Sequence, residues 1–264
     1  MARKIVITSG KGGVGKTTIV SALGATLARK GYKTLLVDMD FGLNNLDVVM
    51  GIENKIVYDI IDVLEGKCLP RQAVIQDIYT DNLYIFPSVH SFCSVRFGAK
   101  ELLRIIADMD NLFDFVLIDC PAGIDGGFRR AIECADEYIV VTTPHLSAIR
   151  DADKVCSSLD SRNMGPIYII LNKVRGDLIV DNKMLGVDII KDHINGELIG
   201  VVPIDDIVDI QMFEGGQFDL DSSLMLSMNN IAKFLLGGEI KLFDCSKKYK
   251  GMIGSVRKRL RQKL

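Results

Sequence analysis

The sequence lacks the spaced cysteines and histidines from which most metal centres and disulfide frameworks are built. Its six cysteines are dispersed and include no Cys-x-x-Cys pair, and its three histidines are equally scattered. Zinc coordination therefore has little support. Reduced structural thiols are favoured, although one cysteine from each subunit of a dimer could still share an iron–sulfur cluster.

Long apolar runs are also missing. No stretch approaches the roughly 18 apolar residues of a membrane-spanning helix, and Met1–Lys4 leads into a strand pattern without an apolar signal region. We therefore expect a cytoplasmic location. With 264 residues, 48% of them hydrophobic and 25% charged, the chain can bury a full core in a single α/β domain.

Short apolar runs alternate with helical patterns along most of the chain. Such runs are typical of buried parallel strands, so the alternation predicts a doubly wound α/β fold with a mostly parallel sheet and helices on both faces. A functional site is then expected at the carboxyl ends of the strands. The predicted strands are Lys4–Thr8, Lys33–Asp38, Leu83–Phe86, Phe115–Asp119, Tyr138–Thr142, Ile167–Leu171 and Leu198–Val202.

A glycine-rich segment lies between the first predicted strand and a predicted helix at Thr17–Lys30. It matches G-x-x-x-x-G-K-[ST], a phosphate-binding loop (P-loop) whose glycines let backbone N–H groups surround an anion. Lys16 is expected to reach the β- and γ-phosphates, and the Thr17 hydroxyl to ligate Mg²⁺. A plain glycine-rich turn would explain the glycines but not the lysines. The predicted nucleotide-binding residues here are Gly10, Lys11, Gly12, Gly13, Val14, Gly15, Lys16, Thr17 and Thr18.

A second lysine, Lys11, follows the first glycine of this loop. Because Lys16 already serves the phosphates, Lys11 either has a different anion as its partner or is a solvated surface lysine. In this feature the sequence resembles the deviant Walker A family, the MinD/ParA group, whose lysine at this position reaches the phosphates bound by the other subunit. The resemblance implies a P-loop NTPase that forms a homodimer when ATP is bound.

Three aspartates at predicted strand ends fit that resemblance. Asp119 precedes Cys120–Gly123, which resembles a Walker B strand and its switch loop, and it would hold Mg²⁺ directly or through water. By resemblance, Asp40 would orient or activate the attacking water and Asp38 would lie near the metal. Any one of these aspartates could instead be a helix cap or turn residue. The implied catalytic residues are Lys11, Lys16 and Asp40, and the implied metal ligands are Thr17, Asp38 and Asp119.

Two later segments bear on the choice of base. Asn172 matches the place of an adenine-binding asparagine in this family, and Val201–Asp205, which contains Pro203, resembles the next contact segment. A carboxamide can pair with the Watson–Crick edge of adenine, whereas a guanine site would normally have an aspartate where Arg175 stands. ATP with Mg²⁺ is therefore favoured over GTP, although an asparagine that ends a strand is often only a turn residue.

Further stretches together resemble the septum-site MinD branch of the family, and the resemblance spans nearly all of residues 2–205. It implies a slow, partner-stimulated ATPase that works with a MinC-like septation inhibitor and a MinE- or DivIVA-type topological partner. Ser147–Asp153 would lie at the dimer and partner surface, although Arg150 and Asp151 could equally form an exposed ion pair worth under about 1 kcal/mol. The stretches are Phe41–Asp47, Met50–Gly51, Val57–Asp59, Asp119–Gly123 and Ser147–Asp153.

Residues 247–264 form a basic tail after the ATPase domain expected over residues 1–246. The eight basic residues of the tail leave 24 of the chain's 32 for the body, against 34 acidic residues, so the body carries about −10 and the tail about +8. At about 100° per residue the apolar side chains of the tail fall in one helical stripe. The stripe consists of Tyr249, Met252, Ile253, Val256, Leu260 and Leu264.

Such a helix can lie in the interface of an anionic membrane, and two copies on an ATP-bound dimer would bind far more strongly than one. MinD relatives use a C-terminal helix in this way, so we expect peripheral attachment to the inner face of the cell membrane. Docking on the acidic body and binding of nucleic acid are the alternatives for the tail. For the whole protein, the alternatives are a ParA-like DNA-segregating ATPase, a flagellar-number ATPase and a non-enzymatic regulator.

Overall fold

The computed structural model describes residues 1–41, 45–88, 97–205, 218–251, 254–255 and 258 of the chain. Its centre is an 8-stranded sheet with the strand order β3-β4-β2-β5-β1-β6-β7-β8. The neighbouring strands are parallel except for β3, which pairs antiparallel with β4. The strands are β1 (Arg3–Thr8), β2 (Thr34–Asp38), β3 (Ile75–Gln76), β4 (Leu83–Phe86), β5 (Phe115–Asp119), β6 (Glu137–Thr142), β7 (Ile167–Val174) and β8 (Glu197–Pro203).

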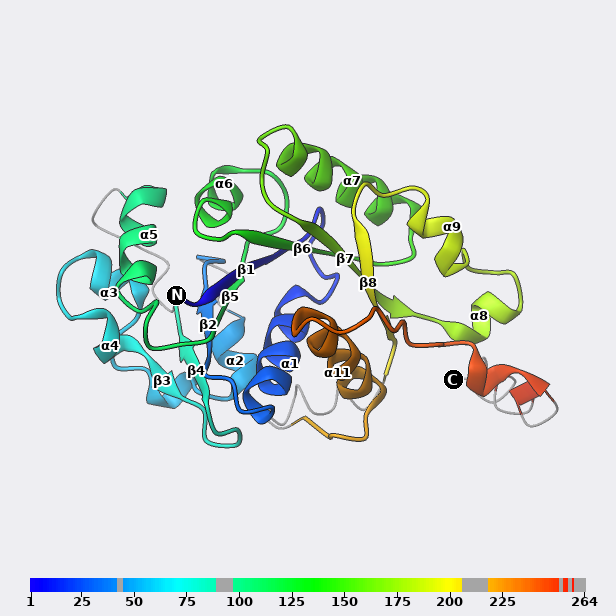
Figure 1. Ribbon diagram of the computed structural model, residues 1–264, viewed down its shortest axis with the longest axis horizontal. Coiled ribbons are helices and arrows are strands. Elements are labelled where there is room, and N and C mark those ends of the chain that lie inside the picture. Colours follow the sequence, from blue (N-terminus) through cyan, green and yellow to red (C-terminus); the bar gives the residue numbers. More distant parts are fainter. Residues whose placement is uncertain (42–44, 89–96, 206–217, 252–253, 256–257, 259–264) are drawn as a thin grey trace.

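Helices cover both faces of this sheet (Figure 1). Helices α1 and α11 pack against each other on one face, and α5, α6 and α7 cover the other. The helices are α1 (Lys16–Arg29), α2 (Leu46–Met50), α3 (Ile60–Leu64), α4 (Pro70–Ala73), α5 (Ala99–Ala107), α6 (Gly126–Ile132), α7 (Leu146–Asp160), α8 (Gly176–Val180), α9 (Val187–Lys191) and α11 (Ser223–Leu235), with 3₁₀ turns η1 (Glu53–Lys55) and η2 (Lys247–Tyr249).

The central strands of the sheet contribute side chains to two hydrophobic cores, because successive side chains point to opposite faces. Ile5 and Ile7 of β1 belong to the core that contains Leu23 of α1, whereas Val6 belongs to the core that contains Phe128 of α6. Burial on both faces explains why the strands are continuous apolar runs rather than alternating ones. The predicted fold class is confirmed.

Most predicted strand bounds agree closely with the structure. Leu83–Phe86 and Phe115–Asp119 have the predicted limits. The predicted end at Leu171 was wrong, because β7 continues to Val174 through shifts of register against β8. Strand β3 (Ile75–Gln76) was not predicted, since two partly exposed edge residues carry too little of a pattern.

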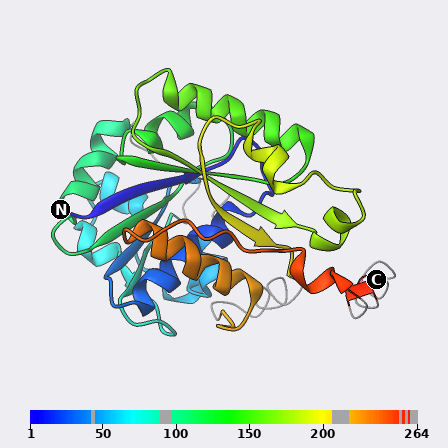
Figure 2. The same ribbon diagram turned by 45° about the vertical axis from the view of Figure 1, so that its right-hand side comes forward.

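After α11 the chain turns back along the sheet and runs to α8, where its last described residues lie (Figures 1 and 2). Turn η2 of this segment contacts α8. Within the described ranges, no helix has the length and apolar character needed to cross a membrane.

Candidate functional site

The phosphate-binding loop joins β1 to α1 at the carboxyl edge of the sheet. Gly15 caps the helix with a φ of 93°, in the left-handed region that glycine adopts without a steric penalty. The amino end of α1, which carries partial positive charge, borders a cavity of about 440 Å³. Its lining residues are Gly12, Gly13, Gly15, Lys16, Thr17, Thr18, Asp40, Asn45, Val48, Val49, Pro121 and Ala122.

Gly10, the first glycine of the motif, is needed for packing against α7. A Cβ atom at this position would lie 2.3 Å from the backbone carbonyl of Asp151. Any side chain here would therefore displace α7 or the loop. The P-loop and the segment predicted as a dimer and partner surface are thus in direct backbone contact.

The two lysines of the loop have opposite environments. Lys16 is 8% exposed, and its Nζ lies 3.9 Å from Oδ2 of Asp40 inside the cavity. Lys11 is exposed. Only Lys16 is therefore placed to serve an anion bound in the cavity.

Three predicted metal ligands converge behind the loop. Asp38 and Asp119 are register partners at the ends of β2 and β5, and Thr17 Oγ1 donates a hydrogen bond of 2.7 Å to Asp119 Oδ2. The backbone N–H of Asp40 donates to Asp38 Oδ1 at 2.9 Å. The remaining oxygens, Asp38 Oδ2 and Asp119 Oδ1, are buried and have no hydrogen-bond partner among the described residues. Such oxygens are suited to a cation.

Burial changes the proton affinity of this pair. It raises the pKa of Asp38 to about 8, with a further contribution from the negative charge of Asp119. Burial also raises the pKa of Asp119 to about 6, opposed by Lys16 and by the hydrogen bond from Thr17. Burial therefore favours the protonated form of Asp38 in the protein alone, whereas a bound cation would favour the carboxylate.

The residues present fit Mg²⁺. Magnesium prefers oxygen ligands and usually binds through one or two carboxylates together with substrate phosphates and waters. Thr17, Asp38 and Asp119 provide such oxygens beside the cavity. Among the residues that the structure describes, no group of three or more His, Cys, Asp or Glu side chains could hold a metal ion. Two carboxylates and a hydroxyl beside the phosphate-binding loop suit a metal that arrives with the nucleotide.

A second cavity of about 140 Å³ shares Gly15 and Thr18 with the first and includes the two predicted base contacts, Asn172 and Pro203. One amide N–H of Asn172 is already used, because Nδ2 donates to the Val14 carbonyl at 2.8 Å. The carboxamide oxygen and the second N–H remain for a base.

Comparison with known proteins identifies the family. A family model described as an AAA domain matches residues 2–161. The septum site-determining protein MinD of Synechocystis sp. is 40% identical over 263 residues, which cover 98% of this chain and 99% of that protein. The chain belongs to the MinD family. The predicted resemblance is therefore confirmed, and the chain is a P-loop ATPase of the septum site-determining type.

Solved structures of MinD proteins agree with the fold. The MinC:MinD cell division complex of Aquifex aeolicus includes a chain with a TM-score of 0.84 and 36% identity, covering 92% of this chain and 99% of that one. MinD of Pyrococcus horikoshii, solved with Mg-ADP, has a TM-score of 0.78 and 28% identity, with coverage of 90% and 98%.

Sequence reasoning missed several residues that line the two cavities. Val48 and Val49 come from α2, and Asn45 directly precedes it. This helix was not predicted because five residues are too few for a helical period. Lys173 also lines the second cavity. Its place directly after Asn172, a predicted base contact, could have marked it as a candidate site residue. Residues 42–44 of the MinD-like stretch Phe41–Asp47 lie outside the described residues.

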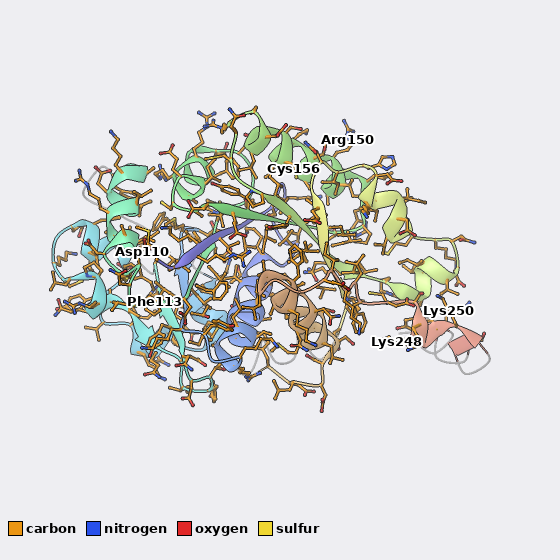
Figure 3. All side chains as sticks on the ribbon, in the orientation of Figure 1. Asp110, Phe113, Arg150, Cys156, Lys248 and Lys250 are labelled. Atoms are coloured by element: carbon orange, nitrogen blue, oxygen red, sulfur yellow. The ribbon has the colours of Figure 1, made fainter. Side chains whose placement is uncertain are left out.

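The expected partner surface on α7, Ser147–Asp153, takes part in an ion pair, but it is not the Arg150–Asp151 pair suggested by the sequence. Asp151 Oδ1 accepts a hydrogen bond from Lys154 Nζ at 3.0 Å, one helical turn further on. Arg150 is exposed and points away from the sheet (Figure 3). The alternative of an Arg150–Asp151 pair was therefore wrong, because neighbouring positions on a helix do not face each other.

The tail begins differently from the expected MinD-type helix. Lys247–Tyr249 form the 3₁₀ turn η2, and Tyr249 is 6% exposed, so its assignment to a lipid-facing stripe was wrong. Lys248 and Lys250 lie beside α8 (Figure 3). Lys258 Nζ donates to Asp181 Oδ1 at 2.5 Å, at the end of α8. The other stripe residues, Met252, Ile253, Val256, Leu260 and Leu264, lie outside the described residues.

Proposed function

We propose that this MinD-family chain is an ATP-dependent, dimerising ATPase that attaches to the inner face of the membrane and positions the division septum. The main support for the proposal is the difference in burial between the two lysines of the phosphate-binding loop. Lys16 lies inside the cavity with Asp40, whereas Lys11 is exposed. An exposed cation beside the nucleotide cavity suits an anion on another molecule, and the family places Lys11 against the nucleotide of the second subunit.

Hydrolysis in this proposal depends on the groups that surround the phosphates. The backbone N–H groups of the loop and the Lys16 ammonium would stabilise the charge that develops during phosphoryl transfer. The Asp40 carboxylate would orient the attacking water. Thr17, Asp38 and Asp119 would hold Mg²⁺, which neutralises phosphate charge when bound. The Mg-ADP complex of the P. horikoshii relative supports this choice of nucleotide and metal.

Replacing Lys11 with alanine should prevent dimerisation in ATP while leaving the affinity for ADP within about threefold, because Lys11 does not line the cavity that would hold its own subunit's phosphates. Light scattering with a slowly hydrolysed ATP analogue would measure the dimer, and calorimetry the affinity. Lys55→Ala, at another exposed lysine, is the control and should dimerise normally. A Lys11→Ala protein that dimerises as well as the wild type would exclude the contact between subunits.

Membrane attachment in this proposal is the role of the tail. Its charge of about +8 opposes a body of about −10, which suits anionic lipid head groups. In this structure Lys258 is paired with Asp181, and the two side chains are about one-fifth exposed. Lipid phosphates would therefore compete with a carboxylate for the same ammonium group, and a partly exposed pair of this kind is weak enough to exchange.

Co-sedimentation with anionic vesicles tests the proposal. The full chain should bind in ATP and much less in ADP, because only the dimer presents two tails. A chain ending at Lys250 should not bind, and it keeps the buried Tyr249 that an earlier cut would remove. Failure of the full chain to bind in ATP would contradict membrane attachment by the tail. Equal binding in ATP and ADP would make the tail a constant anchor and would contradict regulation by dimerisation.

We infer a MinC-like septation inhibitor as one partner and a MinE- or DivIVA-type protein as the factor that places the complex. The A. aeolicus complex of MinC and MinD supports the first of these. Helix α7 is the proposed partner surface, since Gly10 brings it into contact with the P-loop, so a change in the loop on nucleotide binding can reach it directly.

A further inference from the structure

The end of β7 reaches the back of the P-loop with two consecutive side chains. Lys173 Nζ donates a hydrogen bond of 2.9 Å to the carbonyl of Gly13, and Asn172 Nδ2 donates one of 2.8 Å to the carbonyl of Val14. The contacts join residues about 160 positions apart in the chain. Two neighbouring carbonyls of the loop are therefore held from outside by two neighbouring residues of one strand.

The backbone at Lys173 is shaped for this contact. Its φ is 56°, a left-handed conformation that residues with a Cβ rarely adopt. The pairing of β7 with β8 shifts register between Leu171 and Val174, which brackets the same residue. A side chain held in such a conformation requires surroundings that maintain it, and conformations of this kind are concentrated at functional sites.

The direction of the two hydrogen bonds matters for an anion in the cavity. In a phosphate-binding loop the N–H groups converge on the anion while the carbonyls point away from it. Holding the carbonyls of Gly13 and Val14 therefore fixes the orientation of the peptide units whose N–H groups follow them. A loop ordered before the ligand arrives loses less conformational entropy on binding.

We propose that Lys173 is a positioning residue of the nucleotide site, which orients the P-loop for phosphate through the Gly13 carbonyl. Its side chain also lines the second cavity, so the same residue borders the place expected for the base. The assignment depends on nucleotide binding at the P-loop, which the family establishes, and not on the proposed membrane cycle. Lys173 acts on the loop and does not itself touch the reacting atoms.

Calorimetry with ADP and with inorganic pyrophosphate, each with Mg²⁺, tests the assignment. Lys173→Met keeps the aliphatic stem and removes the donor, so it should weaken both ligands about tenfold, as loss of a charge-assisted hydrogen bond implies. Lys173→Arg keeps a donor and should recover most of the affinity. In steady-state assays Lys173→Met should raise KM and leave kcat nearly unchanged, because the loop is ordered once nucleotide saturates it. Lys55→Met is the matched control.

Lys173→Gly distinguishes an effect on nucleotide affinity from an effect on the stability of the fold. Glycine accepts a positive φ readily, so the nucleotide-free variant should melt at the same or a higher temperature than the wild type while binding both ligands about tenfold more weakly. Unchanged affinity of Lys173→Met for pyrophosphate would overturn the proposal, and a loss confined to ADP would make Lys173 a base contact only. A loss of affinity accompanied by a lower melting temperature in every variant, arginine included, would reduce Lys173 to a structural role.

Discussion

Replacing Lys16 with alanine should lower the rate of phosphate release by about 10²- to 10³-fold, the range for loss of one donor that stabilises transition-state charge. Lys16 is the only cation among the described residues that line the 440 Å³ cavity. In the wild-type protein the Asp40 carboxylate lies 3.9 Å from Lys16 Nζ. Without Lys16, this carboxylate would face the phosphates with no compensating positive charge. ATP-dependent dimerisation should be lost together with ATP binding. Phosphate release with vesicles and calorimetry with ATP would measure these losses.

Lys30 provides a control for this experiment. It is exposed at the opposite end of α1, so Lys30→Ala changes the charge of the protein equally without touching the cavity. This control should retain wild-type phosphate release. A Lys16→Ala protein whose rate stayed within about tenfold of the control would show that backbone N–H groups alone carry the phosphate chemistry.

Replacing Asp40 with alanine should have the opposite combination of effects, with turnover reduced at least about 10²-fold and the ATP-bound dimer retained. Asp40 lies beside Lys16, so removal of its negative charge frees that ammonium for phosphate and should leave ATP affinity equal or higher. The backbone N–H of Asp40, which donates to Asp38, is kept in the variant. Single-turnover hydrolysis and light scattering in ATP would measure turnover and dimer separately.

Asp40→Asn distinguishes the carboxylate charge from the shape of the side chain. The amide has nearly the same size but cannot accept a proton or orient water as a carboxylate does. It should be as slow as Asp40→Ala. Turnover by Asp40→Asn near the wild-type rate, or loss of the dimer in both variants, would remove Asp40 from its proposed role.

Much of the fold could be predicted from local pattern. The strands Leu83–Phe86 and Phe115–Asp119 have their predicted limits because a strand buried on both faces is a continuous apolar run with polar residues at its end. The P-loop was predicted from spacing, since its geometry depends on glycines and a lysine within nine consecutive residues. Signals of this kind are local in the chain and do not depend on distant residues.

The prediction failed where distant segments decide the structure. Lys173 was overlooked because its partner, the Gly13 carbonyl, is 160 residues away. Tyr249 was assigned to a lipid-facing stripe from its helical spacing alone. That spacing does not show that the turn containing Tyr249 packs against α8. The Arg150–Asp151 pair was considered from adjacency, although helix geometry turns Asp151 toward Lys154.

The sequence by itself determined the parallel α/β fold, the phosphate-binding loop and the difference in charge between tail and body. Each of these follows from patterns of neighbouring residues or from composition. Only the tertiary structure decided that Asp38 and Asp119 lie side by side with unpartnered oxygens, that Lys16 is enclosed while Lys11 is exposed, and that β7 holds the P-loop from behind. These features depend on which strands become neighbours. Strand order follows from packing both faces of the whole sheet, which no single segment encodes.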